Sequence, residues 1–182
     1  YFRDIVRYVP ERKSWYCYEA GVWSADVGSL RTMEYCKELA DAMVMYALSI
    51  EDEQKRQEFI KYCGKWQTRR VRETILRDAQ GIYPIAMSEF DEDPYVFNCK
   101  NGTLHLDTME FTEHRAEDRL TKISDVEYAP EARCDRFLTF VDEITSGNAD
   151  TAKFLQKALG YGISGDTRHE CLFTLYGAKT RN

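Results

Sequence analysis

A run of basic residues in the middle of the chain could bind anions. Between Lys55 and Arg77 the sequence carries eight lysines and arginines against Glu58 and Glu73. Each such side chain that neutralises a nucleic-acid phosphate releases condensed counterions and so favours binding. A solvated helix face is the alternative explanation. The residues that we predict to contact nucleic-acid phosphates are Lys61, Lys65, Arg69, Arg70, Arg72 and Arg77.

Aromatic residues are interleaved with this basic run. They are Phe59, Tyr62 and Trp66. Aromatic rings can stack on the bases of a nucleic acid, and they can equally fill a hydrophobic core. Both roles stay open at the level of sequence.

An acidic triplet offers a different chemistry. Asp91, Glu92 and Asp93 have the Asp-x-Asp spacing of sites that hold Mg²⁺ for nucleotidyl transfer. However, the triplet lies in an acidic segment that ends in a proline, and no second pair of carboxylates lies nearby in the sequence. A solvated loop is the favoured interpretation, so we predict no metal site there.

The cysteines and histidines indicate neither a zinc site nor a catalytic site. Six cysteines are spread along the chain without a CxxC pair, which favours reduced thiols of the cytosol over a disulfide framework. His169 and Cys171 would share one face of a strand, but nothing nearby would orient the histidine. We therefore predict a core cysteine beside a surface histidine, and no catalytic residue.

The end of the chain has the order of a phosphate-binding loop. An apolar run, residues 171–176, predicts a strand, and Gly177 opens the loop that follows. Backbone N–H groups in such a loop surround phosphate oxygens, and a lysine follows them. The sequence stops before that lysine, and an ordinary glycine turn explains these residues equally simply. The candidate nucleotide-binding residues are Gly177, Lys179, Thr180, Arg181 and Asn182.

The first part of the chain predicts a hairpin and three helices. Aromatic residues at 14–25 alternate about a Glu-Ala-Gly turn, with strands near 14–18 and 21–24. Apolar spacing then predicts a helix from Ser29, its N-cap, to about Ile50. Further helices fit 51–63 and 68–79, and Gly64 is expected to separate them.

The second part predicts another hairpin and two more helices. Asn101-Gly102 marks a turn within 95–112. Helical spacing recurs at 133–144 and 151–159, with Asn148 or Asp150 as a cap. We expect three glycines to break the chain before the terminal strand, at positions 160, 162 and 165.

Bulk composition sets the class of protein. With 43% hydrophobic and 13% aromatic residues among 182, the chain can bury a core, and we expect a mainly helical α+β fold. The net charge of −6 argues against a general nucleic-acid coat. No stretch approaches the roughly 18 apolar residues of a membrane span. Because the chain opens on Tyr1, we expect it to be a piece of a longer protein.

Three segments resemble one family. GYGISGDTRHECLFTLYGAKTRN is similar to the junction in phage and plasmid primase-helicases, relatives of the poxvirus primase-helicase, that leads into the first ATPase strand. FNCKNGTLHLDTMEFTEHRAEDRLTKI resembles their Asn-Gly hairpin segment, and SWYCYEAGVWSAD resembles their Trp-containing hairpin. The patches are scattered along nearly the whole chain.

The resemblance implies a place in a superfamily 3 helicase. Residues 1–170 would form the collar or adaptor domain, and 171–182 would begin an AAA+-like P-loop ATPase domain. Such a region supports hexamer assembly and guides single-stranded or forked DNA for an NTP-driven motor. Counted from Gly177 the loop is one residue longer than a strict GxxxxGK motif, because Ala178 stands where that motif needs glycine. The roles of the individual loop residues are therefore open.

Further expectations concern cofactors and setting. ATP and Mg²⁺ would bind the parent protein, while this piece alone would hold no cofactor and hydrolyse no ATP. The resemblance implies the cytoplasm of a bacterial host, without a membrane partner, and a phage or plasmid as the source. The alternative is a freestanding DNA-binding or protein-interaction module with no motor.

Overall fold

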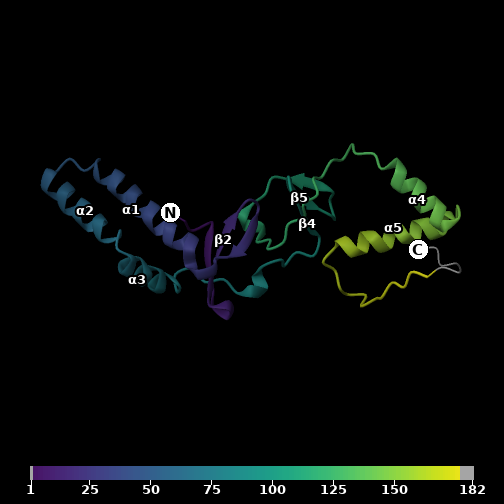
Figure 1. Ribbon diagram of the computed structural model, residues 1–182, viewed down its shortest axis with the longest axis horizontal. Helices are drawn as coiled ribbons and strands as arrows, with labels where there is room; N and C mark the ends of the chain where they lie inside the picture. Colours follow the sequence, from purple (N-terminus) through teal and green to yellow (C-terminus); the bar gives the residue numbers. More distant parts are fainter. Residues whose placement is uncertain (1, 177–182) are drawn as a thin grey trace. The chain divides into compact units, whose positions relative to one another are not determined.

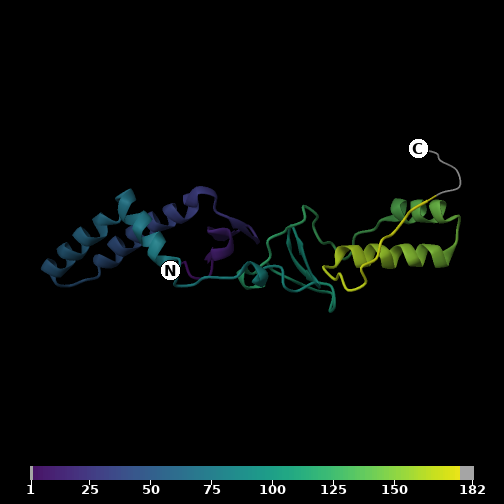
Figure 2. The same cartoon turned by 90° about the horizontal axis from the view of Figure 1, so that it is seen from below.

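The computed structural model describes residues 2–176, which fold as two compact units. Unit 1 holds residues up to 92 together with 114–123, and unit 2 holds 93–113 and the residues from 124 onward. Each unit combines one small antiparallel sheet with helices (Figures 1 and 2). The predicted α+β class is confirmed.

The sheet of unit 1 has three strands in the order of the sequence, β1 (Val6–Val9), β2 (Ser14–Glu19) and β3 (Val22–Ala25). The predicted hairpin is β2–β3, and β1 adds a strand that the sequence analysis missed. One face of the sheet builds a core of Val9, Tyr16, Trp23, Ile85 and Phe90. Segment 114–123 returns to this unit, where the Trp23 indole donates a hydrogen bond to the carbonyl of Ala116 at 2.8 Å.

Three helices complete unit 1: α1 (Leu30–Ala47), α2 (Glu53–Lys65) and α3 (Arg69–Ala79). Helices α2 and α3 follow each other along α1 (Figure 1). Ser29 stands at the N-cap position of α1, as predicted, but its side chain makes no capping hydrogen bond. The Asp26 carboxylate accepts from the backbone N–H groups of Arg31 and Thr32, at 3.0 and 2.9 Å, and so satisfies the free donors of the helix start. Gly64 was wrongly predicted as a terminator, because it lies inside α2.

The sheet of unit 2 is a meander of β4 (Val96–Cys99), β5 (Gly102–His105) and β6 (Glu110–Thr112). The hairpin predicted around Asn101-Gly102 is confirmed as β4–β5, and β6 continues it. The Asn101 side chain donates to the carbonyl of Tyr128 at 3.0 Å and accepts from its N–H at 2.9 Å. One turn residue thus holds a segment distant in sequence against the hairpin.

Two helices follow, α4 (Asp135–Thr145) and α5 (Ala149–Ile163). Asn148 caps α5, as predicted, by accepting from the N–H of Thr151 at 2.9 Å. Gly160 and Gly162 lie within α5 and do not end it, so that part of the prediction is wrong. Neither helix has a buried residue.

The chain after α5 is fastened to the start of β4. The N–H of Gly165 donates to the carbonyl of Pro94 at 2.7 Å, and the Tyr95 hydroxyl donates to Asp166 at 3.0 Å. Arg168 pairs with the same carboxylate at 2.6 Å, and these hydrogen bonds hold the pKa of Asp166 well below its usual range. The fastening fixes where the chain leaves α5.

Residues 171–176 belong to neither a helix nor a strand, so the predicted terminal strand is not formed within the part of the chain that the structure describes. A strand needs a neighbouring strand to pair with, and among the described residues no strand pairs with 171–176. Cys171 is exposed, which corrects the prediction of a core cysteine. The remaining short elements are four 3₁₀ turns, at Pro10–Arg12, Val27–Ser29, Met87–Glu89 and Ala116–Asp118.

Candidate nucleic-acid interface

Helix α2 presents lysines to solvent along one side. Asp52 caps the helix by accepting from the N–H of Lys55 at 3.0 Å. Lys61 and Lys65 are exposed and lie one turn apart, so their ammonium groups project from the same side. No ion pair involves either lysine within the described residues. Both positive charges are therefore available to an anion from solution.

Helix α3 presents three exposed arginines. Arg69, Glu73 and Arg77 are spaced four residues apart and share one face of the helix, and Arg69 pairs with Glu73 at 2.8 Å. Arg69 and Arg77 both line a hollow of about 270 Å³ beside the start of α1. Arg70 is exposed as well. The structure thus brings Arg69 and Arg77 together, with one carboxylate between them.

Arg72 is different, because its side chain is turned inward. It is 7% exposed, and its guanidinium donates to the carbonyls of Trp66 and Gln67, at 3.3 and 2.5 Å. Those carbonyls belong to the end of α2, where backbone acceptors lack partners within the helix. Arg72 therefore joins α3 to α2. Its predicted contact with nucleic-acid phosphates is wrong for this geometry.

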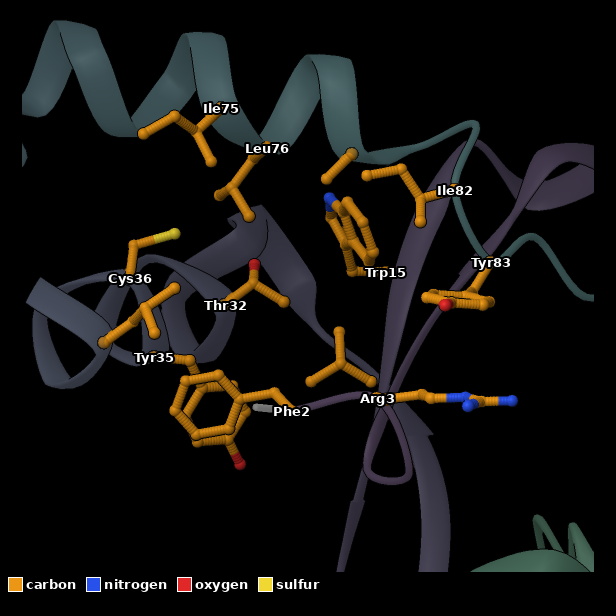
Figure 3. A pocket seen from close by; sticks show the side chains of 13 residues that line it. Phe2, Arg3, Trp15, Thr32, Tyr35, Cys36, Ile75, Leu76, Ile82 and Tyr83 are labelled. Carbon is orange, nitrogen blue, oxygen red and sulfur yellow. The ribbon is translucent and has the colours of Figure 1, made fainter. Parts of the chain in front are cut away.

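The opposite side of α3 packs toward α1 around an apolar cavity of about 290 Å³ (Figure 3). Ile75 and Leu76 point from α3 into this cavity, and Thr32 and Cys36 face them from α1. Burial raises the pKa of the Cys36 thiol. Because apolar residues fix this side of α3, the exposed arginines are held on the outer side.

The aromatic residues of α2 meet one another and a ring from α1. Tyr46, Phe59, Tyr62 and Trp66 form a continuous chain of ring contacts, which we call the aromatic row. Three members were singled out from the sequence, Phe59 and Tyr62 on α2 and Trp66 directly after it, whereas Tyr46 was missed. The missing member belongs to another helix, and spacing within a single helix cannot reveal it.

The acidic triplet is used for local structure. The Asp91 carboxylate accepts from both the N–H and the hydroxyl of Thr121, the former at 2.8 Å. Asp93 accepts from the N–H of Tyr95 at 2.8 Å, as an aspartate does in a turn. Within residues 2–176 no group of three or more His, Cys, Asp or Glu side chains could hold a metal ion.

The structure leaves the predicted nucleotide-binding loop untested. The candidate nucleotide-binding residues lie outside the described residues, so their role stays a prediction: Gly177, Lys179, Thr180, Arg181 and Asn182. Among the helices of the described residues, none combines the length and the apolar character that crossing a bilayer requires.

Comparison with known proteins gives one match. A family model described as "D5 N terminal like" matches residues 1–146, which include both sheets and the helices α1 to α4. No curated protein matches the chain. The candidate interface on α2 and α3 lies wholly inside the matched region.

Proposed function

Because the chain belongs to the D5 N-terminal-like family, whose domains are found in phage and plasmid primase-helicase proteins, we propose that it is the collar or adaptor of a replicative DNA primase-helicase. In this role it guides DNA toward an NTP-driven motor and supports assembly of the motor as a hexamer. ATP and Mg²⁺ serve the motor of the parent protein. The partial loop that begins at Gly177 belongs to the nucleotide site in this proposal, and the chain alone hydrolyses no ATP.

One observation supports the DNA-guiding role more than any other. Within the matched region, five of the six predicted contact residues are exposed on two consecutive helices. Arg72 is the exception among the predicted contact residues, because its guanidinium donates hydrogen bonds to carbonyls at the end of α2. The proposed contacts with DNA phosphates are made by Lys61, Lys65, Arg69, Arg70 and Arg77.

Local charge explains how an acidic chain can bind DNA. The net charge is −6, but exposed charges farther apart than about 10 Å are largely screened at 0.1 M salt. A phosphate near α2 and α3 therefore responds mainly to the charges of those helices. Glu73 offsets part of the charge of Arg69, since the two side chains are paired. Lys61, Lys65, Arg70 and Arg77 then contribute most.

The test is DNA binding by the 182-residue chain, measured by fluorescence anisotropy with labelled single-stranded and duplex oligonucleotides at two salt concentrations. We expect affinity to fall steeply with salt, since binding releases counterions. A variant with Lys61, Lys65, Arg70 and Arg77 changed to Ala should bind weakly and show a flatter salt dependence. Arg72 stays unchanged in this variant, so that a folding defect is not read as lost binding. Absence of binding at low salt would reject DNA guidance.

The assembly role is supported by the exposed apolar side chains of α4 and α5. Phe137, Leu138, Ile144, Phe154 and Leu159 are all exposed. A contiguous apolar surface on an isolated chain marks a contact with protein or membrane. We propose that this surface contacts another copy of the chain in the assembled parent. This surface belongs to unit 2 and the basic residues of α2 and α3 belong to unit 1, so different substitutions test the two roles.

A further inference from the structure

The rings of the aromatic row meet edge to face or at a tilt, and not in parallel stacks. Ring centroids are 6.1 Å apart from Tyr46 to Phe59, 6.2 Å from Phe59 to Tyr62 and 6.4 Å from Tyr62 to Trp66. The interplanar angles are 72°, 35° and 69°, so no pair in the row is stacked. Phe2 and Tyr35 differ, because their rings stack at 4.6 Å and 24° and cover each other.

The two tyrosines of the row are well exposed. Tyr46 is 66% exposed and Tyr62 is 47% exposed, while Phe59 and Trp66 are half-buried. Single exposed aromatic residues are common on protein surfaces, but here the ring of Phe59 connects two exposed tyrosines from different helices. The row is therefore a surface that a ligand with flat apolar groups would fit.

The charges around the row select an anionic ligand. Lys65 lies one turn after Tyr62 on α2, and Lys55 lies two turns before it on the same side. Lys61 is adjacent in sequence. Two carboxylates oppose these lysines: Asp52 pairs with Lys55 at 3.9 Å, and Glu58 accepts a hydrogen bond from Gln54 at 3.2 Å. Within the described residues neither Lys61 nor Lys65 has an ion-pair partner. Flat rings bordered by more lysines than carboxylates suit a polyanion that carries aromatic groups.

We infer that the aromatic row stacks on the bases of single-stranded nucleic acid, with Tyr46 and Tyr62 as the stacking rings and the lysines of α2 on the phosphates. In a duplex the faces of the bases are covered by their neighbours, so the row has nothing to stack on. This inference rests on the proposed DNA-guiding role and deepens it, because it assigns the preferred form of the nucleic acid. Stacking on aromatic side chains tolerates any base sequence.

The experiment uses the full chain and three labelled probes: oligothymidine, a strand of equal length made of abasic sites, and a duplex of equal length. The abasic strand keeps the phosphates but has no bases. We expect oligothymidine to bind at least about tenfold more tightly than the abasic strand, since stacking contributes a measurable share per base. This comparison needs no substitution, so it is independent of any folding defect.

Substitutions then locate the effect. Tyr62→Ala and Tyr46→Ala should each weaken oligothymidine binding by about tenfold and leave abasic binding unchanged. Tyr62→Phe keeps the ring and should bind as the parent chain does. Tyr83→Ala is the matched control, because Tyr83 is also a tyrosine of unit 1 and is 48% exposed, but lies outside the aromatic row and outside α2 and α3.

The outcomes separate this inference from the proposed function. Equal binding of oligothymidine and the abasic strand, with steep salt dependence, would overturn base stacking and leave DNA guidance by the basic side chains intact. A duplex bound as tightly as the single strand, with no effect of Tyr62→Ala, would overturn it as well. No binding of any probe at low salt would overturn both.

Discussion

The helices of unit 1 and those of unit 2 differ in what they bury and what they expose. Helices α1, α2 and α3 each contribute at least one buried residue, and their exposed surface carries lysines and arginines. Helices α4 and α5 contribute none, and their exposed residues include phenylalanines and leucines. The first group is packed within its own unit and exposes basic side chains, whereas the second exposes apolar ones. This difference is the reason why we propose DNA contact for the first group and protein contact for the second.

Thiol reactivity should show the largest contrast between the two groups. Cys17, Cys36 and Cys63 are buried in unit 1, and burial raises the pKa of Cys17 to about 12. Cys134 and Cys171, which flank the helices of unit 2, are exposed. Because only an accessible thiolate reacts, we expect these two to react with a thiol reagent at pH 8 at least about 100-fold faster than the buried ones.

Mass spectrometry after short labelling would identify the modified cysteines. Rapid labelling of Cys36 or Cys63 would show that α1 and α2 are not packed as described.

The raised pKa of Cys17 also predicts a pH effect on stability, since its folded pKa lies above its ordinary value of 9.0. The stabilising contribution of this thiol is complete below about pH 9 and is lost as pH rises toward 12.

Gly102→Ala tests whether unit 2 depends on its sheet rather than on its helices. A Cβ at Gly102 would lie 2.5 Å from the carbonyl oxygen of Thr112 and 2.5 Å from the ring of Phe111. Backbone atoms cannot easily give way, so we expect a loss of about 3 kcal/mol in the free energy of unfolding of unit 2. Urea unfolding followed by circular dichroism measures it. Gly160→Ala is the control, since nothing lies near that position, and it should not destabilise.

Arg72→Ala tests the inward orientation of one arginine among exposed ones. The substitution removes the donor to the carbonyls of Trp66 and Gln67 and should cost about 2 kcal/mol of unit 1 stability. Arg70→Ala, on the exposed side of α3, should change stability by less than about 0.5 kcal/mol. A thermal melt of both variants checks this. Equal stability of the two would contradict the burial of Arg72.

Substitution of the apolar surface of unit 2 should have the smallest effect on folding. Phe154 and Leu159 are exposed on α5, so changing both to Ser should alter the unfolding free energy by less than about 1 kcal/mol. Self-association, followed by sedimentation velocity over a range of concentrations, should decrease. If the double variant associates like the parent chain, the surface is not a contact between copies.

The sequence predicted regular elements well where local signals are strong. The helices, both hairpins and the Asn148 cap follow from spacing, turn residues and capping chemistry, which act over a few residues. Glycine gave errors at three positions, because Gly64, Gly160 and Gly162 sit inside helices whose other residues favour the helix enough to tolerate them. The N-cap position of α1 was predicted at Ser29, but the capping carboxylate was missed because Asp26 reaches the helix start from beyond a 3₁₀ turn.

The candidate site was predicted less completely, since it depends on packing between elements. The basic residues between Lys55 and Arg77 cannot be told apart by residue type, yet Arg72 is buried and Arg70 is exposed. Helical spacing could have revealed the inward orientation of Arg72, because Arg72 is three and four residues from Ile75 and Leu76, which face α1. No such signal links Tyr46 of α1 to the rings of α2, since their contact depends on how the two helices pack.

The most direct test of the account compares two charge-matched variants in their salt dependence of binding to oligothymidine. Arg70→Ala with Arg77→Ala removes two charges from α3, and Lys153→Ala with Lys157→Ala removes two exposed charges from α5. The account predicts that the α3 variant lowers the slope of log affinity against log salt by about 1.4, or about 0.7 per contact, and that the α5 variant does not. Equal slopes for the two variants would contradict the claim that α2 and α3 form the DNA-contacting surface.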